Sequence, residues 1–290
     1  MPRTVDEGFK DFLTKLTPSA IESEAVKKHR ASIKACLEAS YKMNRFVRIG
    51  SFGNGTSIAG YSDVDYLASL PTSQLNQNST YTLSKVKTTL DTRFPRTGVQ
   101  VSCPAVAIPF GTKAAEHTEI VPADFVNEDE YYKIYEIADC SGGWMRVCPD
   151  AHNAYSNYAN SERGGKAKPL IRFIKAWKYY CNVPISSFYL EMQTAKYALG
   201  EDVIVYAIDV KRVLKMLLDS ELAMMQDPMG RSGYIVPCKT EAMKQDALSK
   251  LQIAVSRAEK ALAADSATKT SDAFYWWRLL YNDQFPTYYY

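Results

Sequence analysis

Two carboxylates and a Gly-Ser pair lie close together in the first quarter of this 290-residue chain. Gly50 and Ser51 open a glycine-rich run, and Asp63-Val64-Asp65 closes it just before an apolar segment. If that segment is a strand, the alternation of side chains puts Asp63 and Asp65 on the same face. Two carboxylates so close together repel each other. Mg²⁺ is a natural counter-ion because it binds carboxylates together with substrate phosphate oxygens. Backbone N–H groups and the Ser51 hydroxyl suit such phosphates, so the stretch predicts half of a nucleotide-phosphate site.

This combination resembles the DNA polymerase β-like nucleotidyltransferase superfamily, which is marked by Gly-Ser, a short spacer and Asp-x-Asp. Asp63 follows Ser51 at a spacing of 12 residues, which is typical of that superfamily. The fuller run, Gly-Ser-Phe-Gly-Asn-Gly-Thr-Ser-Ile followed by Ser-Asp-Val-Asp, is most similar to the bacterial CD-NTases, relatives of cyclic GMP-AMP synthase. The alternative is a glycine-rich turn that leads into a strand whose acids face solvent. The Gly-Ser pair at this distance and the apolar strand behind it favour the nucleotide site.

The resemblance implies a third carboxylate on a neighbouring strand, which would complete a site for two metal ions. Residues 120–123, Ile-Val-Pro-Ala, match the hydrophobic-Val-Pro-Ala element that marks this strand in CD-NTase-like enzymes. Glu119 precedes the element and Asp124 follows it. In CD-NTases the third acid comes before the element, and Asp124 also follows Pro122, which is expected to break the strand. We predict Glu119 as the third ligand, a departure from the usual Asp. Asp124 stays the alternative, because the Val-Pro-Ala element alone fixes the strand register weakly. A register shift of one residue would turn each side chain to the opposite face of the sheet.

A second group of predicted contacts lies in the helical part of the chain. Apolar residues at helical spacing from Leu170 to Cys181 predict a helix with a buried stripe. Cyclic GMP-AMP synthase-like enzymes use a Lys on this helix and a Ser-aromatic pair at the start of the next one, and Lys175, Ser187 and Phe188 match in order and spacing. The resemblance implies that Lys175 and Ser187 bind the donor triphosphate and that Phe188 stacks on a base. The alternative is a solvated lysine, a serine that only caps its helix, and a core aromatic.

The sequence patterns of the strands and helices that must position these residues predict a two-lobed α+β protein. Apolar alternation predicts strands around the acids, and helical periodicity predicts helices before the Gly-Ser pair and from residue 168 onward. The predicted strands are residues 63–70 and a strand that carries Glu119 and is expected to break at Pro122. Residues 99–102 and 105–110, which flank Pro104, are predicted to form neighbouring strands or one bent strand. The predicted helices include residues 5–16, 18–43 and 83–93. The resemblance implies a polymerase β-like core with a mixed sheet, a C-terminal helical lobe and a long N-terminal helix that bridges them. We predict a catalytic core at residues 1–165 and, at residues 166–290, a helical lobe that closes the active-site cleft.

The composition is ordinary for a globular protein. A net charge of +3 is too small for a long nucleic-acid surface, whereas a local basic cluster is enough for a nucleotide. No apolar run approaches the ~18 residues that a membrane span needs, and the N-terminal residues lack the apolar core of a signal peptide. The six cysteines contain no Cys-x-x-Cys pair. We therefore expect reduced thiols in a cytoplasmic protein, without a zinc site or a disulfide framework.

Together these features predict a metal-dependent nucleotidyltransferase that uses nucleoside triphosphates. Asp63, Asp65 and Glu119 would hold two Mg²⁺ ions, or Mn²⁺, that activate an acceptor ribose hydroxyl and neutralise charge on the donor α-phosphate and the leaving pyrophosphate. Repeating the step on a bound linear intermediate would close a cyclic di- or trinucleotide. CD-NTases make such second messengers in bacterial anti-phage signalling, so the resemblance also implies a downstream effector.

Three other functions compete with this prediction. An enzyme of the same superfamily can add nucleotides to RNA ends or to a small-molecule hydroxyl; RNA tailing favours a basic groove with aromatic side chains, which the small net charge does not indicate. A non-catalytic binding module is disfavoured by the intact acidic pair. A toxin–antitoxin nucleotidyltransferase is usually much shorter than this chain.

Overall fold

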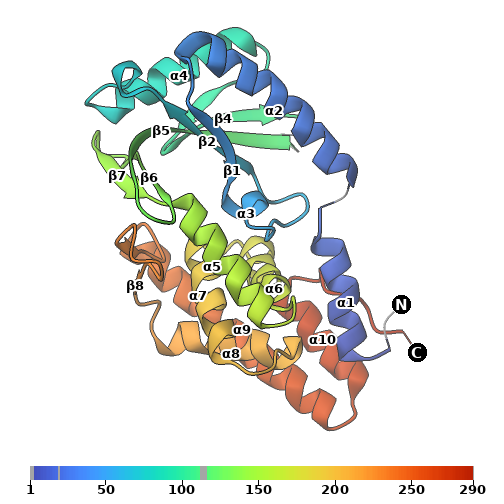
Figure 1. The fold of residues 1–290 in the computed structure, drawn as a ribbon. Coiled ribbons are helices and arrows are strands. Elements are labelled where there is room, and N and C mark those ends of the chain that lie inside the picture. Colours follow the sequence, from blue (N-terminus) through green and yellow to red (C-terminus); the bar gives the residue numbers. More distant parts are fainter. Residues whose placement is uncertain (1–2, 19, 112–115, 290) are drawn as a thin grey trace.

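A mixed sheet occupies one half of the molecule and a group of helices the other (Figure 1). The computed structural model describes residues 3–18, 20–111 and 116–289 of the chain. The predicted α+β class with a C-terminal helical lobe is therefore confirmed. Among the described residues, none of the helices combines the length and the apolar character that crossing a membrane requires.

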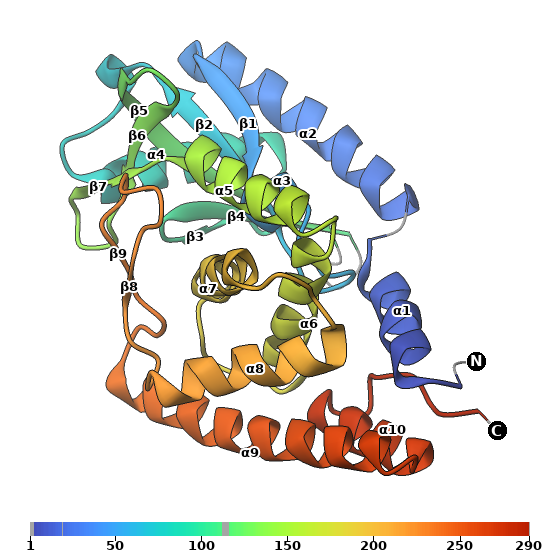
Figure 2. The same cartoon turned by 60° about the horizontal axis from the view of Figure 1, so that its bottom comes forward.

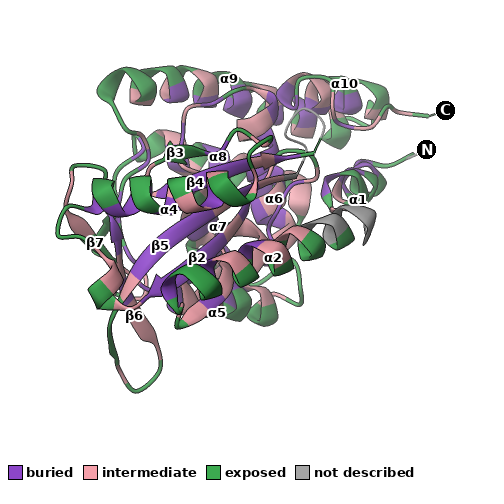
Figure 3. Ribbon diagram, turned by 90° about the horizontal axis from the view of Figure 1, so that it is seen from above, coloured by how far each residue is buried: buried purple, intermediate pink, exposed green. Residues whose placement is uncertain are grey.

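The sheet has the strand order β1-β2-β5-β4-β3, and its second branch consists of β6, which pairs with β5, and β7. Its strands are β1 (Arg45–Ile49), β2 (Val64–Leu70), β3 (Gln100–Ser102), β4 (Ala105–Phe110), β5 (Glu116–Glu128), β6 (Lys133–Ala138) and β7 (Trp144–Val147). The central strands β2 and β5 run parallel, and the other pairs are antiparallel. Strand β2 and residues 120–123 of β5 are largely buried, and the helices packed on the sheet have exposed outer faces (Figure 3). The strand predicted at residues 63–70 is present as β2, and residues 99–102 and 105–110 form two neighbouring strands rather than one bent strand. Glu119 lies on β5, beside β2.

Strand β5 continues through Pro122, so the expectation that this proline breaks the strand is wrong. Pro122 pairs in register with Ala68 of β2. On its other edge β5 changes partner at this point, since its pairing with β4 ends at Ile120 and its pairing with β6 begins at Ala123. A residue without an N–H is tolerated where the ladder on that side is already interrupted.

Two helices cover the outer face of the sheet. They are α2 (Ala20–Tyr41), which corresponds to the predicted helix at 18–43, and α4 (Ser79–Arg93). Asn78 caps α4, because its side chain accepts a hydrogen bond from the N–H of Thr80. Leu37 of α2 and Leu90 of α4 are fully buried in one apolar cluster with the strands. These helices thereby hold the central strands in place from outside.

The helical lobe takes in the first helix of the chain as well as the last third. Its helices are α1 (Val5–Leu16), α5 (Pro149–Glu162), α6 (Ala167–Tyr180), α7 (Ser187–Gly200), α8 (Tyr206–Asp219), α9 (Glu241–Ser266) and α10 (Thr270–Leu280). A short hairpin of β8 (Met225–Gln226) and β9 (Tyr234–Ile235) precedes α9.

Aromatic contacts tie α1 to this lobe, and in Figure 2 it lies beside the C-terminal segment. The ring of Phe9 packs edge-on against Phe173, Trp277 and Phe285, with centroid distances of 5.0, 5.0 and 5.1 Å. The helices α1 and α2 follow one another in sequence, yet the first packs with the helical lobe and the second on the sheet. The domain boundary at residue 165 stays a prediction.

Two of the six cysteines form a disulfide, which corrects the expectation of reduced thiols throughout. Cys103, in the turn between β3 and β4, is bonded to Cys140, in the turn between β6 and β7, across a Cα–Cα distance of 5.7 Å. The other four cysteines are free. A sequence separation of 37 residues gave no sign of this pairing, because the two turns meet only when both strand pairs have joined the sheet.

Candidate functional site

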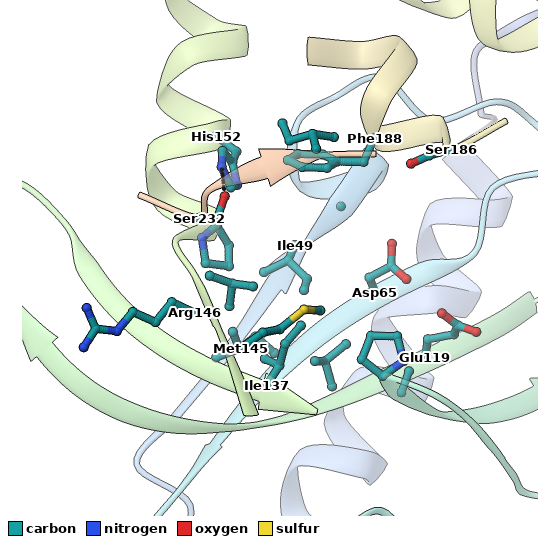
Figure 4. Close-up of a pocket in the computed structure, with 18 of the residues that line it drawn as sticks. Ile49, Asp65, Glu119, Ile137, Met145, Arg146, His152, Ser186, Phe188 and Ser232 are labelled. Atoms are coloured by element: carbon teal, nitrogen blue, oxygen red, sulfur yellow. Dashed lines mark hydrogen bonds between the residues drawn. The ribbon is translucent and has the colours of Figure 1, made fainter. Parts of the chain in front are cut away.

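Two of the predicted acids face each other across the central strands. Asp65, the second residue of β2, pairs in register with Glu119 of β5. Because parallel neighbours in register project their side chains from the same face, both carboxylates point to the same side, as Figure 4 shows. Asp63 lies two residues before Asp65, just before the strand begins. The structure therefore brings the three predicted acids together.

Asp124, the alternative third acid, lies elsewhere. It pairs with Leu70 at the far end of β2, and its Oδ1 accepts a hydrogen bond of 2.7 Å from the Thr72 hydroxyl. Glu119 is thus the acid beside Asp65, and Asp124 faces a different neighbour. That Glu119 binds metal stays a prediction.

His117 is a member of this group that the sequence analysis did not single out. Its Nδ1 lies 3.0 Å from Oδ1 of Asp63. Each of Asp63, His117 and Glu119 offers one ligand atom, and these atoms all lie within 4.8 Å of one another. The signal was present in the sequence: His117 stands two residues before Glu119 in a predicted strand, and strand alternation puts both on one face.

The acids are held in an environment that opposes their ionisation. Burial, and after it the charges of Glu119 and Asp63, raise the pKa of Asp65 to about 8. Burial and the charge of Asp63 also raise the pKa of Glu119. Buried carboxylates that repel one another are stabilised as anions by a cation. This donor set fits a hard divalent metal, with Asp63, Asp65 and Glu119 as the residues that would hold it.

Gly50 lets the backbone approach Asp65 closely. Its φ of +61° lies in the left-handed region, which L-residues with a side chain rarely adopt. A Cβ atom at this position would overlap the Asp65 carboxylate. Ser51 follows in the short helix α3 (Gly50–Gly53). The Gly-Ser pair therefore places its backbone directly against the acidic cluster.

The turn after α3 is tied to the helical lobe by Glu191 of α7. The carboxylate of Glu191 accepts hydrogen bonds of 2.6 Å from the Asn54 amide and of 2.6 Å from the Thr56 hydroxyl. Lys175 of α6 donates to the Thr56 carbonyl at 3.1 Å and lies 3.4 Å from Glu191. Lys175 is fully buried, and this burial lowers its pKa, an effect that Glu191 partly offsets. Its predicted contact with the triphosphate stays a prediction.

A cavity of about 330 Å³ lies between this turn and the start of α7. It is lined by Gly50, Ser51, Asp63, Asp65, Lys175, Lys178 and Ser187, among others. Lys178 Nζ donates to Ser187 Oγ at 2.5 Å, and the Tyr179 hydroxyl lies 3.1 Å from the same atom. Burial lowers the pKa of Lys178 to about 8. Lys178 stands one turn from Lys175 on the predicted helix, and both lysines line this cavity.

A second cavity of about 480 Å³ lies on the other side of Asp65 (Figure 4). Aliphatic side chains such as Ile49 and Ile137 form most of its wall, with Asp65 and Glu119 at one end and Arg146 at the other. Phe188 lines both cavities and packs edge-on against His152, with ring centroids 4.8 Å apart. The acids therefore stand where a polar cavity and a largely apolar one meet.

Comparison with solved structures finds the same fold at low sequence identity. The CdnC protein of Escherichia coli MS115-1, solved in complex with HORMA-deltaN, matches with a TM-score of 0.76 and 15% identity, covering 97% of this chain and 98% of that one. The CD-NTase CdnG of Bradyrhizobium diazoefficiens, in complex with GTP, matches with a TM-score of 0.74 and 14% identity over 95% and 94% of the two chains.

The Vibrio cholerae cyclic AMP-GMP synthase DncV, in complex with the linear intermediate 5′ pppA(3′,5′)pG, matches with a TM-score of 0.67 and 16% identity over 98% and 86%. These matches confirm the predicted polymerase β-like fold and the resemblance to CD-NTases.

Sequence comparison supplies the family. No curated protein matches the chain. The model of the Second Messenger Oligonucleotide or Dinucleotide Synthetase domain matches residues 3–160, which is more than half of the chain and includes Gly50, Ser51 and all three predicted acids. The chain is therefore a nucleotidyltransferase that belongs to the family of second messenger oligonucleotide or dinucleotide synthetases.

Proposed function

We propose that this nucleotidyltransferase joins nucleoside triphosphates into a cyclic di- or trinucleotide, with release of pyrophosphate. The observation that carries the proposal is the position of Asp65 on the wall that two cavities share. A donor and an acceptor nucleotide bound on either side of one acidic cluster have their reacting groups brought together, and positioning of this kind supplies much of the rate.

The polar cavity is proposed to take the donor triphosphate. Gly50 brings its backbone close to the acids, and Ser51 and Ser187 supply hydroxyl groups that donate to phosphate oxygens. Lys178, whose ammonium already lies at the Ser187 hydroxyl, is proposed to offset the triphosphate charge. Lys175, predicted for this role, lines the same cavity and also holds the adjacent turn through the Thr56 carbonyl.

The apolar cavity is proposed to take a base of the acceptor nucleotide, with Phe188 as the stacking partner. Its volume and its mostly aliphatic wall suit the flat, weakly polar body of a base. Phe188 is 37% exposed, so its ring is accessible in part from the cavities that it lines. A linear product that moves between the two cavities would present its remaining triphosphate and its free hydroxyl to the same acids, and a second transfer would close the ring.

Divalent metal, proposed as two Mg²⁺ ions with Mn²⁺ as a substitute, would be held by Asp63, Asp65 and Glu119. When bound, it supplies activation of the acceptor hydroxyl and charge neutralisation at the α-phosphate and the leaving pyrophosphate. The residues' own contribution is the fixed spacing of the carboxylates on two paired strands. No protein nucleophile is required, because catalysis rests on positioning and electrostatics.

The biological setting is proposed from the family. A second messenger acts on a receptor, so a downstream effector is expected, and CD-NTase-like enzymes point to anti-phage signalling in the cytoplasm. No substrate besides nucleoside triphosphates is proposed.

The proposal is tested by incubating the purified protein with the four nucleoside triphosphates, labelled one at a time, and Mg²⁺ or Mn²⁺. We expect pyrophosphate release and a small labelled product that resists phosphatase, because a ring has no terminal phosphate. A product sensitive to phosphatase would indicate a linear oligonucleotide, and elongation of added RNA would favour the tailing alternative. The double variant Asp63→Asn with Asp65→Asn is the control and should make no product while keeping its fold.

A further inference from the structure

His117 stands in the acidic cluster with a nitrogen that has no hydrogen-bond partner. Its Nδ1 is shielded from solvent and makes no hydrogen bond within the described part of the chain. The nearest partner is Oδ1 of Asp63 at 3.0 Å, an ion-pair contact when the imidazole is protonated. The lone pair of a neutral imidazole is satisfied by a metal ion as well as by a proton donor.

The spacing around His117 suits a shared ion. Ligands at right angles on an octahedral ion, with bonds of about 2.1 Å, lie about 3.0 Å apart, which is the observed distance from Nδ1 to Asp63 Oδ1. Glu119 adds a carboxylate oxygen within 4.8 Å of both. The backbone of His117 is fixed by pairing with Pro109 of β4, so the ring is presented from an ordered strand.

We propose that His117 is a ligand of this metal site, together with Asp63 and Glu119, and that its nitrogen makes the site select Mn²⁺ over Mg²⁺. The inference deepens the proposed function and rests on the metal dependence assumed there. Mg²⁺ favours oxygen ligands almost exclusively, whereas imidazole suits the transition metals. A site with three carboxylates and no imidazole would show a much smaller preference.

The test measures metal binding directly rather than turnover. Mn²⁺ is titrated into the purified protein and followed by electron paramagnetic resonance, and pulsed measurements then detect coupling between bound Mn²⁺ and a directly bonded ¹⁴N nucleus. We expect ¹⁴N coupling in the wild-type protein and its loss in His117→Leu, with Mn²⁺ affinity lower by about tenfold or more. Mg²⁺, measured by competition, should lose much less affinity.

A second variant and a matched control keep the test independent of folding defects. His117→Asp replaces the nitrogen with a carboxylate oxygen, so it should bind both ions, show no ¹⁴N coupling and have a smaller ratio of Mn²⁺ to Mg²⁺ affinity. His29→Leu removes another of the chain's three histidines, whose ring stacks on Phe110 at 3.8 Å on the helix side of the sheet, and should leave the coupling intact.

The assignment of His117 as a ligand would be overturned if the wild-type protein bound Mn²⁺ without ¹⁴N coupling. It would also be overturned if the coupling persisted in His117→Leu. An unchanged Mn²⁺ to Mg²⁺ ratio in His117→Asp would overturn the selectivity. Coupling through His117 in a protein that makes no cyclic product would instead refute the proposed function and leave the ligand assignment standing.

Discussion

Lys175 and Glu191 form an ion pair that is almost fully excluded from solvent, with Nζ and Oε2 3.4 Å apart. It joins α6 to α7, and both residues also bind Thr56 in the turn that follows the Gly-Ser pair. The pair therefore fixes the turn that contains Thr56 against the helical lobe. Lys178, one turn further along α6, lines the polar cavity together with Lys175 and contacts Ser187. The two lysines thus share a cavity wall but have different polar partners.

Replacing Lys175 with Met should destabilise the protein. Removing one partner of a buried ion pair leaves the other charge uncompensated, which costs about 3–5 kcal/mol. Chemical denaturation should report this loss as a lower midpoint, with Lys178→Met as the control that stays near the wild-type midpoint. A Lys175→Met protein as stable as the wild type would contradict the structural role of the pair.

Replacing Lys178 with Met should weaken donor binding without loss of stability. A hydrogen bond to a charged group contributes about 1.5–3 kcal/mol, so we expect KM for the donor triphosphate to rise roughly 10- to 100-fold. The measurement is steady-state kinetics with the acceptor saturating, beside a thermal melt of the same sample. A normal KM in Lys178→Met, with a raised KM in folded Lys175→Met, would return the triphosphate role to Lys175.

Donor binding should also weaken as the pH rises. The pKa of Lys178 is lowered to about 8, chiefly by burial, so its ammonium is charged below that pH and neutral above it. A triphosphate anion binds the charged form more tightly, and KM for the donor should therefore increase between pH 7 and pH 9. Lys178→Arg keeps its charge throughout this range and should remove that part of the pH dependence. The same slope in the Arg variant would assign the titration to another group.

Much of the fold followed from local patterns, whereas part of the site did not. The alternation around Asp65 and the Val-Pro-Ala element placed the two central strands correctly, because both signals lie within a few residues of the acids. Lys178 was not assigned a role, since which face of a helix meets a cavity depends on how the lobes pack. The sequence also did not predict the Cys103–Cys140 disulfide or the continuation of β5 through Pro122. Both depend on which strands become neighbours in the folded sheet.

Substitutions of Glu119 and Asp124, the two acids that flank the Val-Pro-Ala element, should have very different effects on the catalytic rate. Glu119→Gln removes a carboxylate beside Asp65, and we expect activity to fall by several orders of magnitude. Asp124→Asn keeps an oxygen that can accept the Thr72 hydrogen bond and should have near wild-type turnover. Initial rates of pyrophosphate release at saturating triphosphate provide the comparison. If Asp124→Asn is the inactive variant, the third ligand has been misassigned.

Gly50 should tolerate no side chain, and Gly60 provides a matched comparison. Both have positive φ, +61° and +72°, so Ala at either position carries a backbone penalty of roughly 1 kcal/mol. Only at Gly50 would the added Cβ overlap the Asp65 carboxylate; at Gly60 it meets no described heavy atom within 4 Å. Gly50→Ala should therefore abolish turnover and weaken Mn²⁺ binding, while Gly60→Ala loses stability alone. Equal loss of activity in both variants would mean that backbone strain, and not displacement of Asp65, accounts for the effect.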